Sequence, residues 1–140
     1  MQGKINIQLL FNGNASDAID FYSSVFKTKP AMLHKMSDAP DSYKMKSVDL
    51  NRIMHCEIKT GGLVLMISDS TEEHIVNNGG MVTLSLNTDT LSEATRLFEV
   101  LSVDGNITYP LQDVFWNAKF GAITDKFGVY WVINYSYEND

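Results

Sequence analysis

The order of predicted elements repeats along this chain, and the repeat limits the folds that the chain can adopt. From residue 5 onward the sequence predicts a strand, a helix and three further strands, and the same order begins again after Asn77-Asn78-Gly79-Gly80. Each half is expected to form one βαβββ module, the first over about 5–70 and the second over about 81–136 of a single domain spanning 1–140. We therefore expect an α+β fold in which the two modules form a curved, mostly antiparallel sheet around a cleft that can receive a small molecule.

The first half contains a clear helix signal between strands. Apolar residues from Ala15 to Phe26 recur at steps of three and four, which is the period of an amphipathic helix. Asn14 is a suitable N-cap for this helix, and Pro30 ends it. The strand Ile5–Phe11 precedes it. The elements that follow are expected to be strands at Ala31–Met36, Arg52–Lys59 and Leu63–Ser68, with a long polar loop at Asp38–Asn51.

The second half repeats this pattern with its own local signals. Thr90-Leu91-Ser92-Glu93 is a capping box, which predicts the start of the second helix. Gly62 and Gly128 lie 66 residues apart and precede the last strand of their respective halves, which supports an internal duplication. The strands of this half are expected at Met81–Asn87, Asn106–Leu111, Lys119–Thr124 and Val129–Tyr135.

The composition is typical of a soluble globular protein. Of the 140 residues, 44% are hydrophobic and 20% are charged. The net charge of −6 and the scattered basic residues argue against a nucleic-acid partner. No stretch approaches the roughly 20 apolar residues of a membrane span, and the N-terminus lacks a signal-peptide pattern. The single cysteine, Cys56, cannot form an intramolecular disulfide, so we expect a reduced, cytoplasmic location without membrane association.

Several short motifs occur in an order and spacing that are more specific together than singly. They are Leu10-Phe11-Asn12-Gly13-Asn14-Ala15, Ala18-Ile19-Asp20-Phe21-Tyr22, Met54-His55-Cys56-Glu57, Met66-Ile67-Ser68-Asp69, Phe115-Trp116, Phe120-Gly121, Phe127-Gly128 and Trp131-Val132-Ile133-Asn134. In these motifs, over about residues 5–135, the chain resembles PhnB-like proteins of the vicinal-oxygen-chelate (glyoxalase/bleomycin resistance/dioxygenase) superfamily. The resemblance implies paired βαβββ modules and a homodimer. Some members are named 3-demethylubiquinone 3-methyltransferases, but this chain lacks the glycine-rich strand-to-helix turn that a methyl-donor site normally uses.

The resemblance also locates the positions at which metal-dependent relatives place their ligands. Those relatives take His, Gln or Glu from the first and last strands of each half. The corresponding positions here are Ile7, Met66, Met81 and Val132, with Gln8 one residue away from the first of them. None of these four side chains suits a hard divalent cation, so we expect no metal and no other cofactor. The residues expected instead to line an apolar ligand site are Met66, Met81, Trp116, Phe120 and Val132.

His55 and Glu57 are the strongest polar candidates for catalysis. Residues two apart on a strand face the same side, so the imidazole and the carboxylate are expected to lie close together. Imidazole titrates near neutral pH and suits proton transfer. The alternative interpretation is a pair that only stabilises the strand. Cys56 faces the opposite side and is expected to be a buried, unreactive thiol.

Three functions remain open from the sequence. The first is a metal-independent protein that binds an unknown small molecule in an apolar cleft. The second is an enzyme in which His55 and Glu57 transfer a proton. The third is a metal-dependent lyase or dioxygenase-type enzyme whose ligands have moved to other positions. Whether the protein is an enzyme is therefore left open.

Overall fold

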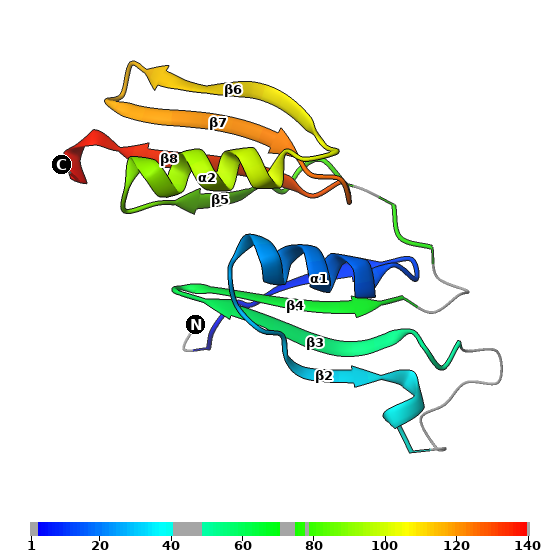
Figure 1. Cartoon of the computed structure of the whole chain (residues 1–140). Coiled ribbons are helices and arrows are strands. Elements are labelled where there is room, and N and C mark those ends of the chain that lie inside the picture. The colour runs from blue at the N-terminus through cyan, green and yellow to red at the C-terminus, as the bar shows by residue number, and fades with distance from the viewer. Residues whose placement is uncertain (1–2, 41–48, 71–74, 78, 140) are drawn as a thin grey trace. The chain divides into compact units, whose positions relative to one another are not determined.

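The computed structural model describes residues 3–40, 49–70, 75–77 and 79–139. The chain divides into two compact units, Met1–Asn77 and Asn78–Asp140, each with one α-helix and one four-stranded sheet (Figure 1). No helix in the described part of the chain is both long and apolar enough to span a bilayer.

The first unit has a mixed sheet with strand order β1-β4-β3-β2. Its outer strand β1 is parallel to β4, whereas β4 pairs antiparallel with β3, and β3 with β2. Its elements are β1 (Ile7–Phe11), α1 (Ala15–Val25), β2 (Ala31–Lys35), the 3-10 helix η1 (Met36–Asp38), β3 (Ile53–Thr60) and β4 (Leu63–Asp69).

The second unit repeats this topology strand for strand. Its sheet has the order β5-β8-β7-β6, with β5 parallel to β8 and the other two pairs antiparallel. The common order confirms the two βαβββ modules predicted from the sequence. The elements are β5 (Leu84–Asn87), α2 (Leu91–Leu101), β6 (Asn106–Val114), β7 (Ala118–Thr124), β8 (Tyr130–Ser136) and the 3-10 helix η3 (Tyr137–Asn139).

The core of the first unit lies between α1 and its sheet. The helix packs against β3 and β4 through a buried stripe that includes Tyr22. Alternate residues of the two strands, such as Ile58 and Leu65, are buried on the side that faces the helix. Asn14 occupies the N-cap position, but its side chain makes no capping hydrogen bond. Asp69, at the end of β4, performs that role, because its Oδ1 accepts hydrogen bonds from the first backbone N–H groups around the helix start, and its Oδ2 accepts one from the start of β3.

The core of the second unit is built around Trp131. Its side chain is fully buried, and α2 packs against β7 and β8 beside it. The indole Nε1 donates a 2.9 Å hydrogen bond to Oδ2 of Asp125, which is itself 3% exposed. Thr90 caps α2 as predicted, its hydroxyl accepting a hydrogen bond from the backbone N–H of Glu93.

Two strand boundaries in the second unit differ from the sequence prediction by three residues, and the others by at most one. The strand predicted at Met81–Asn87 begins at Leu84, so Met81 precedes it and is 97% exposed. The strand predicted to end at Leu111 continues to Val114 as β6 in spite of Pro110. Proline is tolerated there because β6 is an edge strand, where a missing backbone N–H need not break a ladder bond.

Candidate functional site

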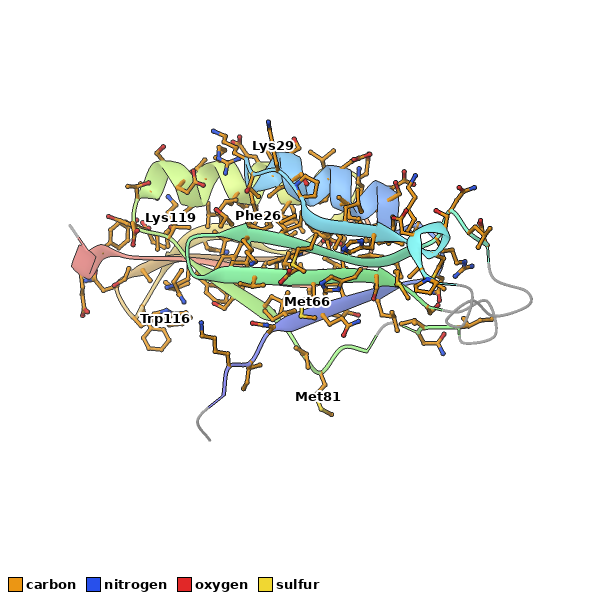
Figure 2. All side chains as sticks on the ribbon, turned by 90° about the horizontal axis from the view of Figure 1, so that it is seen from below. Phe26, Lys29, Met66, Met81, Trp116 and Lys119 are labelled. Carbon is orange, nitrogen blue, oxygen red and sulfur yellow. The ribbon has the colours of Figure 1, made fainter. Side chains whose placement is uncertain are left out.

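Each sheet has one face that its own helix does not cover, and the strand register identifies the residues on it. In the first unit Met66 lies opposite both Gln8 and Glu57, so these three side chains share a face. Their neighbours Leu65 and Ile67 are fully buried on the helix side. Figure 2 shows Met66 on the side of its sheet opposite α1. We call this side the open face of the unit.

The open face of the first unit is largely polar. Gln8 Nε2 donates a 2.9 Å hydrogen bond to the hydroxyl of Ser68. Glu57 lies between two basic groups, with its Oε2 3.8 Å from His55 Nε2 and its Oε1 4.0 Å from Lys59 Nζ. The His55 and Glu57 side chains are 29% and 14% exposed, so the pair is only partly accessible to solvent. The structure thus brings His55 and Glu57 together as predicted, at a separation longer than a hydrogen bond.

On the first strand, the residue that faces the same side as Met66 is Gln8 and not the predicted Ile7. Ile7 lies opposite the fully buried Leu65, which places it on the helix side, and Gln8 takes the open face. Slipping a strand by one residue moves its side chains to the other face of the sheet. The thioether of Met66, which was predicted, therefore has the amide of Gln8 as its neighbour.

In the second unit the matching pair is Ser85 and Val132. These two residues lie opposite each other in the parallel ladder of β5 and β8, as Gln8 and Met66 do in β1 and β4. Sequence reasoning chose Val132 but missed Ser85, because Met81 was assigned to the strand that actually begins three residues later. The 76-residue spacing between the helix starts, Ala15 and Leu91, carries Gln8 to Leu84, one residue before Ser85, and was the signal that came nearest to it.

The open face of the second unit carries aromatic rings. Phe120 on β7 lies at the centre, with the ring centroid of Tyr109 at 5.7 Å and that of Trp116 at 5.6 Å. Both neighbours stand steeply to Phe120, at interplanar angles of 70° and 75°. Phe115 packs edge-on against Trp116 at 5.0 Å. We call these four residues the aromatic cluster.

Three of the four aromatic side chains in the cluster are exposed to solvent. Phe115 is 97% exposed, Trp116 51% and Tyr109 41%. In Figure 2 Trp116 projects away from α2 and from the core of its own unit. Trp116 and Phe120 were predicted as ligand-binding residues, whereas Tyr109 was missed, because a register irregularity in β6 is what places it opposite Ala122 on the open face.

The polar pair and the aromatic cluster occupy corresponding positions in the two modules. Glu57 lies opposite Met66 on β4, and Ala122 lies opposite Val132 on β8. His55 lies two residues before Glu57 on β3, and Phe120 lies two residues before Ala122 on β7. The duplicated fold thus presents one polar and one aromatic version of the same surface.

A shallow depression of about 290 Å³ lies at the end of β2 beside η1. Its polar lining comes from His34 and Asp38, and neither His55 nor Glu57 contributes to it. His34 is exposed and lies opposite His55 in the ladder of β2 and β3. The depression is therefore separate from the two candidate catalytic side chains.

One further prediction concerns a reactive group. Cys56 is fully buried, and burial raises the pKa of its thiol, which disfavours the reactive thiolate. Within the described ranges of the chain, no three His, Cys, Asp or Glu side chains come together in a way that could hold a metal ion.

Known proteins resemble this chain over almost its whole length. Residues 3–134 match the family described as 3-demethylubiquinone-9 3-methyltransferase. Protein YjdN from Escherichia coli (strain K12) is 34% identical over 137 residues, which cover 90% of each chain. Among solved structures, protein PA1353 from Pseudomonas aeruginosa is 32% identical with a TM-score of 0.85, covering 96% of this chain and 98% of its own.

Two other solved structures extend the comparison. A putative 3-demethylubiquinone-9 3-methyltransferase, PhnB protein, from Bacillus cereus is 27% identical with a TM-score of 0.78, covering 96% of this chain and 100% of its own. A glyoxalase/bleomycin resistance protein/dioxygenase family enzyme from Burkholderia phytofirmans PsJN has a TM-score of 0.57 at 13% identity, covering 93% of this chain and 95% of its own. At that identity the similarity shows the fold alone.

Proposed function

This chain belongs to the 3-demethylubiquinone-9 3-methyltransferase family of PhnB-like proteins, with a glyoxalase-like fold, and from that premise we propose that it binds a small, largely apolar molecule without a metal. The observation that carries the proposal is the aromatic cluster on the open face of the second unit. A flat ligand can lie against Trp116 and Phe120 there, with Val132 on the same sheet face behind them.

Contacts with the accessible rings can contribute a large part of the free energy of binding. An aromatic contact contributes about 0.5–1.5 kcal/mol beyond the burial of its area. Contacts with Tyr109, Trp116 and Phe120 would together contribute roughly 1.5–4.5 kcal/mol on this scale. Since millimolar affinity corresponds to about 4 kcal/mol, burial of the ligand's own apolar surface would carry the affinity into the micromolar range.

The two strand-to-helix turns of this chain do not resemble those of a methyl-donor site. Methyl-donor sites normally use a glycine-rich turn that leads from a strand into a helix. The turn between β1 and α1 reads Asn12-Gly13-Asn14, with a single glycine, and the turn between β5 and α2 reads Thr88-Asp89-Thr90, with none. Binding a small molecule at the aromatic cluster does not require such a turn.

Proton transfer by His55 is the second candidate function. The 3.8 Å approach of His55 to Glu57 on a partly exposed face is the observation that favours it. In this scheme His55 acts as the base and Glu57 orients its ring, and the pair shortens when substrate is bound. Loss of His55 in His55→Ala would then lower turnover by about 10²–10⁴-fold. Lys59→Ala is the matched control, because Lys59 contacts the same carboxylate and is not the proton acceptor.

The binding proposal is tested with a panel of neutral and charged bicyclic aromatic compounds. Bound compounds should raise the melting temperature and change tryptophan fluorescence through Trp116, since Trp131 is fully buried. Trp116→Ala and Phe120→Ala should each weaken binding about tenfold. Ile107→Ala is the control, because Ile107 lies on the same strand as Tyr109 but opposite Ile123, on the helix side of the sheet.

Two results would overturn the proposal. One is binding that both cluster variants leave unchanged. The other is a stoichiometric metal, found by elemental analysis of the purified protein, whose removal abolishes binding. The second result would favour a metal-dependent enzyme with relocated ligands.

A further inference from the structure

We propose that the molecule bound at the aromatic cluster is an organic cation, such as a quaternary or aromatic ammonium compound. The inference rests on the proposed binding function and names the chemical class of its ligand. It combines the distribution of charge along the chain with the kind of surface that the cluster presents.

The negative charge of the protein is concentrated in the unit that carries the aromatic cluster. Residues 1–77 contain nine Asp and Glu against eight Lys and Arg, a net charge of −1. Residues 78–140 contain eight Asp and Glu against three Lys and Arg, a net charge of −5. At long range the net charge of this unit attracts cations and repels anions.

The three basic side chains of the second unit are already placed beside other groups. Arg96 forms an ion pair with Glu93 at 2.7 Å, which raises the pKa of the guanidinium. Lys126 lies over the ring of Phe127, 5.5 Å from its centroid. Lys119 stands opposite an acidic residue, Asp113, in the ladder of β6 and β7. A carboxylate or phosphonate ligand would have to compete for these cations, whereas a cationic ligand has no such need.

The rings of the cluster are suited to a cation. The face of an aromatic ring is electron-rich, and a cation within about 6 Å of the ring centre is attracted to it, most strongly over tryptophan. Tyr109 and Trp116 pack against Phe120 at interplanar angles of 70° and 75°, so the rings are not stacked face to face. Trp116 is half exposed and therefore accessible to a solute. Ring faces in a strongly acidic unit form a surface complementary to an apolar cation.

The test compares three flat probes of similar size by isothermal titration calorimetry. They are N-methylquinolinium, which is cationic, quinoline, which is neutral near neutral pH, and naphthalene-1-carboxylate, which is anionic. We expect the cation to bind about tenfold more tightly than quinoline, and the anion to bind most weakly. The advantage of the cation should shrink as salt is added, because the charges of the unit are screened.

Trp116→Leu separates the charge preference from apolar binding. Leucine keeps an apolar side chain but has no ring face, so this variant should lose the preference for N-methylquinolinium and retain weak binding of quinoline. Fluorescence of the buried Trp131 confirms that the variant is folded. Ile107→Leu is the matched control and should preserve the preference.

The outcomes distinguish the two proposals. Equal affinities for the cation and for quinoline, both lowered by Trp116→Leu, would overturn the cation inference and support the binding function. Three affinities that do not respond to Trp116→Leu would overturn both. If that variant instead abolishes self-association and leaves all affinities unchanged, the cluster is an interface between copies of the chain, and the cation inference is wrong.

Discussion

Replacing Asp125 by alanine is expected to destabilise the second unit by about 3–5 kcal/mol. Three donors converge on this carboxylate. Its Oδ1 accepts hydrogen bonds from the backbone N–H groups of Phe127 at 2.9 Å and Val129 at 3.0 Å, and its Oδ2 accepts one from the indole of Trp131 at 2.9 Å. The side chain therefore shapes the turn into β8 and also satisfies the largest residue of the core.

The magnitude follows from what each donor loses. The two backbone N–H groups lie in a turn that water can reach, so each loss is expected to cost about 1 kcal/mol. Trp131 is fully buried, and an unsatisfied donor there costs about 1–3 kcal/mol. Asp125→Asn keeps one acceptor oxygen for the backbone but turns an NH₂ group toward the indole, so it should cost only about 1–3 kcal/mol.

Urea unfolding followed by tryptophan fluorescence measures this effect. Both tryptophans, Trp116 and Trp131, lie in the second unit, so the signal reports on that unit. Glu99→Ala removes one exposed carboxylate from the same unit and should change stability by less than about 0.5 kcal/mol. A loss below about 1 kcal/mol in Asp125→Ala would show that the indole finds another partner, and would refute the reasoning.

Three further expectations concern stability. Asp69→Ala should lower the midpoint of urea unfolding, followed by circular dichroism, by an amount equivalent to about 2–3 kcal/mol, whereas Asn14→Ala should change it little, because Asp69 and not Asn14 caps α1. Gly121→Ala should cost about 1–3 kcal/mol in the same assay, since the added Cβ would lie 2.6 Å from a ring carbon of Phe98, and an unchanged midpoint would mean that the ring moves aside freely. Burial raises the pKa of the Cys56 thiol above its ordinary value of 9.0. At a pH between these two values the unfolded chain loses the thiol proton, whereas the native protein keeps it. The stability that Cys56 contributes below pH 9.0 is therefore lost as the pH rises through the native pKa. Alkylation of Cys56 by iodoacetamide at pH 9.0 should therefore be slow until urea unfolds the chain, and rapid labelling of the native protein would contradict this.

The fold was largely predictable because its signals are local and repeated. The period of three and four that predicted α1 matches a stripe that the structure buries, and the Thr90 hydroxyl caps α2 as predicted. Cys56 is buried, as predicted for a free cysteine on the face opposite His55 and Glu57. Duplication strengthened each signal, since each strand and α-helix of one half had a counterpart in the other. The start of β5 was predicted too early, because Met81 is apolar and fits a strand pattern. The strand begins at Leu84, where pairing with β8 begins.

The sequence by itself determined the two βαβββ modules, the polar pair of His55 and Glu57, and the presence of aromatic residues near the end of the chain. It did so because these features depend on residue type and on spacing along one strand or helix. The tertiary structure alone decided which residues face one another across strands. Parallel pairing set Gln8 beside Met66 and Ser85 beside Val132, and an irregular register in β6 brought Tyr109 to Phe120. Register depends on hydrogen bonds between segments far apart in the chain, and a shift of one residue reverses the face of every side chain, so local pattern cannot specify it.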